Sequence, residues 1–290
     1  MDFYLTALLQ GLCLSGMAFG IFISMKIFNI PDITTDGSYT LGGAVSGLLL
    51  SLHLPAGMIF PIVVLAGACA GVCTGLIHTK LKINPLLSGI LVMTGLYSIN
   101  LSIMGRSNIP MLNYKTIFNR LHLVDDLNLN SLIILLIIVG LLIFLIGFIL
   151  KSDYGITMRA TGNSENMVRA LGVNIDRIKV VGLAFANALT AISGFLMTQF
   201  QGFADINMGI GIVIVGLGSV IVADTFINWL SIKSVWITLI LVCLGAVIFQ
   251  FVLAFTLSVG IDPTLLKLMT ALFVLLIVSL PQFNFTRRAL

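Results

Sequence analysis

The chain has 290 residues, of which 59% are hydrophobic and only 9% are charged, and its mean hydropathy is +1.14. Soluble domains carry about 25% charged residues, so this composition excludes a soluble protein and indicates an integral membrane protein. Long uncharged runs occur throughout the chain, which also excludes a soluble domain with one anchor. We read the net charge of +4 as basic residues kept on one membrane face, and we expect no nucleic-acid partner.

Hydrophobic length predicts an all-α membrane protein with about nine transmembrane segments, because a helix needs about 20 apolar residues to cross a bilayer. The segments are expected at 3–25, 38–52, 54–77, 85–104, 131–150, 180–200, 209–223, 235–257 and 265–280. No basic residue precedes the first segment, which we interpret as a retained span rather than a cleaved signal. No Asp or Glu falls inside any predicted segment, and Lys267 is close enough to the end of the ninth to reach the interface.

Basic residues predict the orientation of the chain. With residues 151–179 in the cytoplasm, alternation places eleven Lys and Arg residues inside and four outside, in agreement with the positive-inside bias. The inside residues are Lys26, Lys80, Lys82, Lys151, Arg159, Arg169, Arg177, Lys179, Lys233, Arg287 and Arg288. The N-terminus is then outside and the C-terminus inside.

Two stretches of the chain resemble each other. Gly42 lies in the second segment and Pro85 opens the fourth, whereas Gly218 lies in the seventh and Pro263 opens the ninth, so the separations are 43 and 45 residues. The predicted orientation puts the two prolines on opposite faces, which indicates inverted repeats at about 36–104 and 209–280 within a single transmembrane domain, 1–290. Inverted repeats are typical of transporters.

The second and seventh segments are the shortest, at about fifteen apolar residues each, and glycine interrupts both. Short or broken helices at membrane depth need surrounding protein or a water-filled cavity, and they indicate a substrate path. The predicted path residues are Ser38, Thr40, Gly43, Asn207, Gly209 and Gly211. The alternative, that such glycines only allow close helix packing, is the expected role of Gly67, Gly71 and Gly75. Asp36 is expected to cap the second segment.

Two polar connections stand out. Residues 151–179 contain a helix candidate at 164–171. Asn163 or Ser164 can cap its N-terminus, Glu165 suits the positive end of the helix dipole, and Gly172 can terminate the helix. A short capped helix suits contact with a partner, and a surface loop that holds one turn of helix is the alternative. The outer connection 105–130 is amphipathic and is expected to lie on the membrane or to dock a soluble partner.

No metal site is predicted. Cys13, Cys69, Cys73 and Cys243 all fall in predicted segments, and no His or carboxylate accompanies Cys69 and Cys73 in theirs. His122 is interpreted as an ordinary polar loop residue.

The polar loop resembles that of a known family. Residues 155–165, GITMRATGNSE, and 169–174, RALGVN, are similar to the cytoplasmic loop R-A-x-G-x-N-x-x-x-A-x-x-x-G-I-N of bacterial ABC-importer permeases of the branched-chain amino acid and ribose type. Val168 stands where that loop usually has alanine. Residues 29–38 and 201–211 resemble the subgroup assigned to tryptophan or other amino acids, and the similarity covers nearly the whole chain.

This resemblance implies that the loop contains a coupling helix, which sits in a cleft of an ATP-binding subunit. Carried over position by position, the coupling residues are Arg159, Gly162, Asn163, Glu165, Arg169, Leu171 and Gly172. The chain has no G-x-x-x-x-G-K-[ST] phosphate loop, so ATP and Mg²⁺ are expected on the partner subunit, with no cofactor in this chain and no enzymatic activity of its own.

The resemblance further implies an importer subunit in the bacterial cytoplasmic membrane, with lipid around it and an extracellular or periplasmic solute-binding protein. The substrate is expected to be a small polar solute, most readily an amino acid, and an aromatic one is compatible. A second permease copy is expected in a homodimer, with a paralogous permease as the alternative. An ion-coupled secondary transporter would share the inverted repeats. An intramembrane enzyme or structural subunit would need a catalytic constellation, and the predicted segments contain none.

Overall fold

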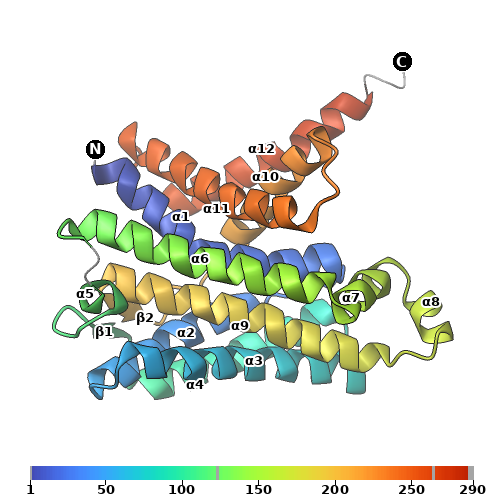
Figure 1. Ribbon diagram of the computed structural model, residues 1–290, viewed down its shortest axis with the longest axis horizontal. Coiled ribbons are helices and arrows are strands. Elements are labelled where there is room, and N and C mark those ends of the chain that lie inside the picture. Colours follow the sequence, from blue (N-terminus) through green and yellow to red (C-terminus); the bar gives the residue numbers. More distant parts are fainter. Residues whose placement is uncertain (1, 122–123, 263–264, 287–290) are drawn as a thin grey trace.

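Long helices make up most of the computed structural model, which describes residues 2–121, 124–262 and 265–286 (Figure 1). The elements are α1 (Asp2–Ile21), a π-helical turn η1 (Phe22–Ile27), α2 (Thr34–Ser51), α3 (Ala56–Lys80), α4 (Pro85–Met104), β1 (Asn108–Pro110), α5 (Ile117–Arg120), α6 (Leu127–Lys151), α7 (Asp153–Asn163), α8 (Glu165–Ala170), α9 (Ile175–Gln201), β2 (Phe203–Asp205), α10 (Ile212–Trp229), α11 (Val235–Ser258) and α12 (Leu266–Thr286).

Within the described ranges, seven helical stretches are long and apolar enough to cross a membrane. They are Phe3–Ile27, Ala56–Lys80, Pro85–Met104, Leu127–Lys151, Ile175–Gln201, Ile212–Trp229 and Val235–Ser258. The predicted second segment forms α2, and the ninth falls in α12, whose shorter apolar part is Leu266–Ile277. The chain is therefore a multi-pass helical membrane protein, and nine crossings stay a prediction.

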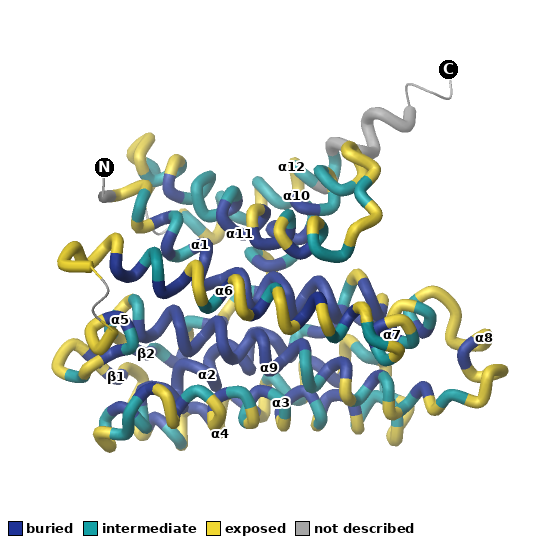
Figure 2. Tube along the Cα trace, in the orientation of Figure 1, coloured by how far each residue is buried: buried dark blue, intermediate teal, exposed yellow. Residues whose placement is uncertain are grey.

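Helices α1 and α9 form the centre of the bundle, and α9 packs against α1, α2 and α3 (Figure 2). Small residues allow this close approach. A side chain at Gly16 would put its Cβ 2.9 Å from the Leu189 carbonyl oxygen, and one at Gly67 would lie 2.7 Å from the carbonyl oxygen of Asn187. Gly71 and Gly75 face α9 in the same way, so the packing role predicted for this glycine series is confirmed.

The packing of the helices is consistent with two structural repeats of three helices each. Helices α2, α3 and α4 contact one another, and so do α10, α11 and α12. Helix α9 lies against α2 and α3, while α1 lies against α10 and α11. The inverted symmetry itself stays a prediction. Pro263 of the second motif lies outside the described residues, as do His122, Arg287 and Arg288 of the orientation and loop predictions.

The connection predicted to be amphipathic, 105–130, folds onto its own chain. Strand β1 pairs antiparallel with β2, and Ile109 lies opposite Ala204. The backbone N–H of Ile117 donates to Oε1 of Gln199 at 2.8 Å, and the rings of Phe118 and Phe200 meet edge to face. The inner side of this connection therefore covers the end of α9, whereas its outer side is open to other contacts.

Asp36 does not cap α2, contrary to the sequence-based expectation. Its two carboxylate oxygens accept hydrogen bonds from the backbone N–H groups of Gly211, at 3.0 Å, and Val213, at 2.9 Å. These groups open α10, whose own N-cap residue provides no side-chain hydrogen bond. Helix N-termini leave such N–H groups unpaired, and burial makes this costly. Asp36 is thus a capping residue from 175 positions away in the chain.

We predict that Asp36→Ala lowers the stability of the protein by roughly 3–6 kcal/mol, because it removes two hydrogen bonds to a charged acceptor, each of which contributes about 1.5–3 kcal/mol. Asp126→Ala is the matched control, since Asp126 caps α6 at an exposed position by accepting from the Asn128 N–H, and its loss costs about 1 kcal/mol. Thermal unfolding of the detergent-purified variants measures both effects. Equal shifts in the two variants would contradict the role of Asp36.

Candidate functional site

Residues 151–179 form two short helices at one end of the bundle, opposite β1 and β2 (Figure 1). The predicted helix at 164–171 is confirmed as α8. Ser164 Oγ accepts from the Met167 N–H at 3.4 Å, Glu165 lies in the first turn, and Gly172 follows the helix with φ of +80°. Helix α7 was not predicted, although Ser152 followed by an acidic residue is a usable N-terminal signal.

Helix α8 extends from the bundle and presents mainly exposed side chains (Figure 2). Met167 is 54% exposed and Leu171 73% exposed, with the charged side chains of Glu165 and Arg169 exposed beside them. Of the residues in this helix, Val168 is buried. Apolar groups at a tip flanked by both charge signs suit contact with another protein.

Lys179 connects helix α8 to the bundle. Its Nζ lies 2.6 Å from Oε1 of Glu165 and 3.4 Å from Nε2 of His78. The other ring nitrogen of His78 lies 2.9 Å from the carbonyl oxygen of Ile83, in the α3–α4 turn. One buried cation therefore joins α8, α9 and the end of α3. Sequence reasoning used Lys179 only for orientation, because neither partner is near it in the chain.

Helix α7 is held by contacts of a different kind. Arg159 Nη2 donates to the Leu150 carbonyl oxygen at 3.1 Å, and Gly162 packs directly against the carbonyl of Ile27. The hydroxyl of Tyr154 donates to the Ile178 carbonyl oxygen at 3.1 Å, and burial raises the pKa of Tyr154 to about 12, so the phenol stays a donor at neutral pH. Arg159 and Gly162 thus fix α7 to the bundle.

The other five coupling residues are solvent-exposed. Asn163, Glu165, Arg169, Leu171 and Gly172 are all exposed on or beside α8. The structure therefore divides the seven residues into two that hold α7 to the bundle, of which Arg159 is also exposed, and five that are exposed on or beside α8.

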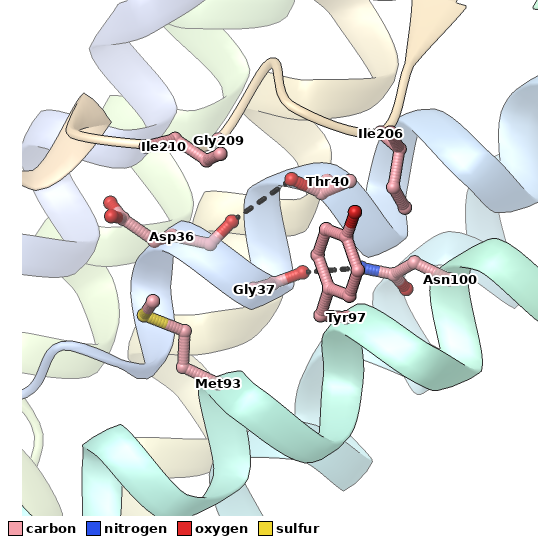
Figure 3. Close-up of a pocket in the computed structure, with 9 residues that line it drawn as sticks. All are labelled: Asp36, Gly37, Thr40, Met93, Tyr97, Asn100, Ile206, Gly209 and Ile210. Carbon is pink, nitrogen blue, oxygen red and sulfur yellow. Dashed lines mark hydrogen bonds between the residues drawn. The ribbon is translucent and has the colours of Figure 1, made fainter. Parts of the chain in front are cut away.

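A small pocket lies where the 206–212 segment crosses α2 (Figure 3). It is lined by Asp36, Gly37 and Thr40 of α2, by Met93, Tyr97 and Asn100 of α4, and by Ile206, Gly209 and Ile210. Asn100 Nδ2 donates to the Gly37 carbonyl oxygen at 3.2 Å, and its Oδ1 has no hydrogen-bond partner among the described residues. The pocket measures about 40 Å³, which has room for water, whereas small-molecule sites measure about 300–1,000 Å³.

The structure separates the predicted path residues. Thr40 and Gly209 line the small pocket, whereas Asn207 lines a larger cavity formed with α1 and α11. Gly211 has φ of +82° directly before α10, a conformation that glycine adopts without strain.

Ser38 and Gly43 lie in the packed interior. Ser38 Oγ donates to Asn187 Oδ1 at 2.7 Å, and a Cβ on Gly43 would lie 2.7 Å from Thr198 Cγ2. In this conformation both residues have the surroundings that helix packing requires.

Sequence reasoning missed a buried polar network around Asp32. Asn187 Nδ2 donates to Oδ2 of Asp32 at 2.7 Å, the Thr34 N–H donates to Oδ1 at 2.9 Å, and the hydroxyls of Thr34 and Thr74 lie 2.7 Å apart. Asp32 is 1% exposed. The network joins the segment before α2 to α9 and α3. The predicted segments contain no acid, yet the folded bundle encloses two, Asp32 and Asp36.

A bundle of apolar helices, an irregular segment that enters it before α10, and an exposed two-helix loop are typical of a membrane transport subunit. A family model described as "Branched-chain amino acid transport system / permease component" matches residues 3–279. The chain belongs to this family of ABC-type permeases.

Individual relatives agree with this assignment. The chain is 40% identical to a tyrosine transport system permease protein of Clostridioides difficile over 281 residues, which cover 97% of this chain and 92% of the relative. It is 36% identical over 274 residues to an uncharacterized protein of Rickettsia prowazekii, covering 92% and 94% of the two chains. A ribose import permease protein of Haemophilus influenzae is 24% identical over 204 residues, covering 67% of this chain and 60% of the relative. No solved structure matches the chain significantly.

We predict that Lys179→Ala raises amide hydrogen exchange in residues 165–172 by roughly two- to fivefold, the effect of losing a partly exposed ion pair. Lys151→Ala is the matched control, because Lys151 is a basic residue of the same loop whose ammonium group lies over the ring of Trp236 in α11. Exchange measured by mass spectrometry tests this. Equal protection of α8 from amide exchange in the two variants would contradict the proposed connection of α8 to the bundle through Lys179.

Proposed function

We propose that this chain is the transmembrane subunit of a binding-protein-dependent importer that takes up an amino acid. The observation that carries the proposal is the exposed, capped helix α8, fixed to the bundle by Lys179, in a chain of this permease family. The chain forms the path and transmits movement, and a partner subunit binds ATP and Mg²⁺ and hydrolyses the nucleotide.

The five exposed coupling residues form the contact with that ATP-binding subunit. Leu171 and Met167 provide apolar contact area, and Glu165 and Arg169 provide charges that set orientation. Movement of the partner then reaches α9 and the α3–α4 turn through Lys179 and His78. The α7–α8 loop lies on the cytoplasmic face of a bacterial cytoplasmic membrane, with the N-terminus outside and the C-terminus inside.

One relative supports the proposed substrate class. A tyrosine transport permease is 40% identical over nearly the whole chain, so an amino acid with an aromatic side chain is the proposed cargo. A solute-binding protein delivers it to the face formed by β1, β2 and α5. The path passes along the 206–212 segment, where Thr40 and Gly209 line a pocket on one side and Asn207 lines a cavity on the other.

An ion-coupled transporter is the second candidate, and the buried acids Asp32 and Asp36 are the observation that favours it. Both carboxylates accept hydrogen bonds from protein donors, which stabilises them as structural groups. The energy source distinguishes the two candidates: uptake driven by ATP supports the importer, and uptake driven by an ion gradient alone supports the secondary transporter.

We predict that Glu165→Lys combined with Arg169→Glu reduces ATP-driven uptake by at least about tenfold, because both charges at the contact are reversed. The complex of this chain, its ATPase and its binding protein is reconstituted in liposomes for the measurement. Lys233→Glu is the control, since Lys233 is exposed in the α10–α11 loop. Normal uptake by the double variant would contradict the proposed contact with the ATP-binding subunit.

We predict two copies of this chain in the assembled importer. Each copy presents one α8, whereas two ATPase subunits that close on each other need two docking helices, and a C2 dimer supplies them. The mass of the purified complex decides the point. One copy of this chain beside a different permease would refute the homodimer.

A further inference from the structure

A second cavity, of about 420 Å³, lies beside the 206–212 segment, on the side toward α1 and α11. Asn207 and Met208 line this cavity, whereas Ile206, Gly209 and Ile210 line the small pocket of Figure 3. The segment therefore separates two spaces of very different size. Only the larger one falls in the range of small-molecule sites, about 300–1,000 Å³.

We propose that this cavity is the site where the transported amino acid binds within the permease. The proposal rests on the function proposed above. It places ligand binding in the space between α1, α11 and the 203–212 segment, and not in the small pocket between α2 and the 206–212 segment. The carrying observation is an amide pair. Gln250 Nε2 donates to Gln10 Oε1 at 3.2 Å, while Gln250 Oε1 is buried and has no hydrogen-bond partner among the described residues.

Charge favours a ligand with an ammonium group. Asp205 is the one charged residue among those described as lining the cavity, and no Lys or Arg stands beside it there. Its carboxylate accepts from the Asn207 N–H at 2.8 Å and from Asn108 Nδ2 at 3.3 Å. An ammonium group donates to Gln250 Oε1 and is attracted by Asp205, while the side-chain amides of Gln201 and Asn207 can donate to the ligand carboxylate.

The remaining wall suits a large apolar side chain. Phe203 is 41% exposed, and Met197 and Met208 contribute polarizable thioethers to the same cavity. Aromatic rings pack well against both groups. A sugar would leave these surfaces uncovered, and an anionic solute would face Asp205 without a counter-charge. The lining therefore selects a zwitterion with an aromatic or long apolar side chain.

The position of the cavity fits delivery from outside. It is lined by Phe203 and Asp205 of β2, at the end of the bundle opposite α7 and α8 (Figure 1). A ligand released at that end is close to this cavity and far from α7 and α8. Asp36 fixes the far end of the 206–212 segment through Gly211 and Val213.

The test fills the cavity. Leu253→Trp places an indole in it from α11, and Leu244→Trp is the matched control, since Leu244 is on the same helix and 46% exposed away from the cavity lining. In liposomes with the complete importer, Leu253→Trp is expected to reduce ATP-driven uptake of L-tyrosine by at least about tenfold and the control by less than about twofold. Equal uptake by both variants, with wild type active, overturns the cavity as the binding site.

A binding readout separates this inference from the proposed function. Met208→Cys in a background without the four native cysteines is labelled with an aqueous maleimide, and L-tyrosine is expected to slow labelling at least about tenfold, with D-ribose as the control. Gln250→Leu should abolish this protection, because it removes the unpaired acceptor. If wild type shows no ATP-driven uptake, the proposed function fails, and the labelling result still decides the site. Equal labelling with and without tyrosine overturns the inference.

Discussion

The arrangement of this protein depends on one capping interaction, between the Asp36 carboxylate and the first N–H groups of α10. The first N–H groups of α10 have no partner within their own helix, and Val213 is buried, so leaving its N–H group unpaired would cost free energy. A carboxylate also matches the positive end of the helix dipole. Because Asp36 belongs to α2, the same contact fixes the 206–212 segment on that helix. The separation of the two cavities follows from this contact.

Helix α9 connects the parts that the proposed function requires. At one end Lys179 holds α8, in the middle Asn187 bonds to Asp32 and Ser38, and near the other end Gln199 accepts from the Ile117 N–H. Glycines on α1 and α3 bring their backbones against it, which leaves little room for sliding without loss of packing. A displacement applied at α8 therefore reaches the α2 network through a rigid element. Such a connection is geometric, and the uptake variants test whether it is used.

Sequence reasoning succeeded where the signals are local. The caps of α8 lie within eight residues of one another, and the Gly67 series has helical spacing, so both could be predicted. The roles of Asp36 and Lys179 could not, since each contact joins residues that are far apart in the chain. Residues of the substrate path were ambiguous for a physical reason: glycine removes bulk equally well for a solute and for a neighbouring backbone. Contacts of Gly43 and Gly209 with protein atoms show how the fold uses them in this conformation.

Energetics limit how the cavity can open toward the α8 side. Two hydrogen bonds to a charged acceptor contribute about 1.5–3 kcal/mol each, so separating the 206–212 segment from α2 costs roughly 3–6 kcal/mol. Gly209 also packs against the Asp36 carbonyl and the Thr40 hydroxyl, contacts that the same separation would lose. A movement that carries α2, this segment and the start of α10 together keeps these contacts. It then changes the boundaries with α4, where Met93 and Tyr97 line the small pocket, and with α9. Because Lys179 couples α8 to α9, a displacement of the α7–α8 loop would reach the unit formed by α2, the 206–212 segment and the start of α10 at the boundary between α2 and α9.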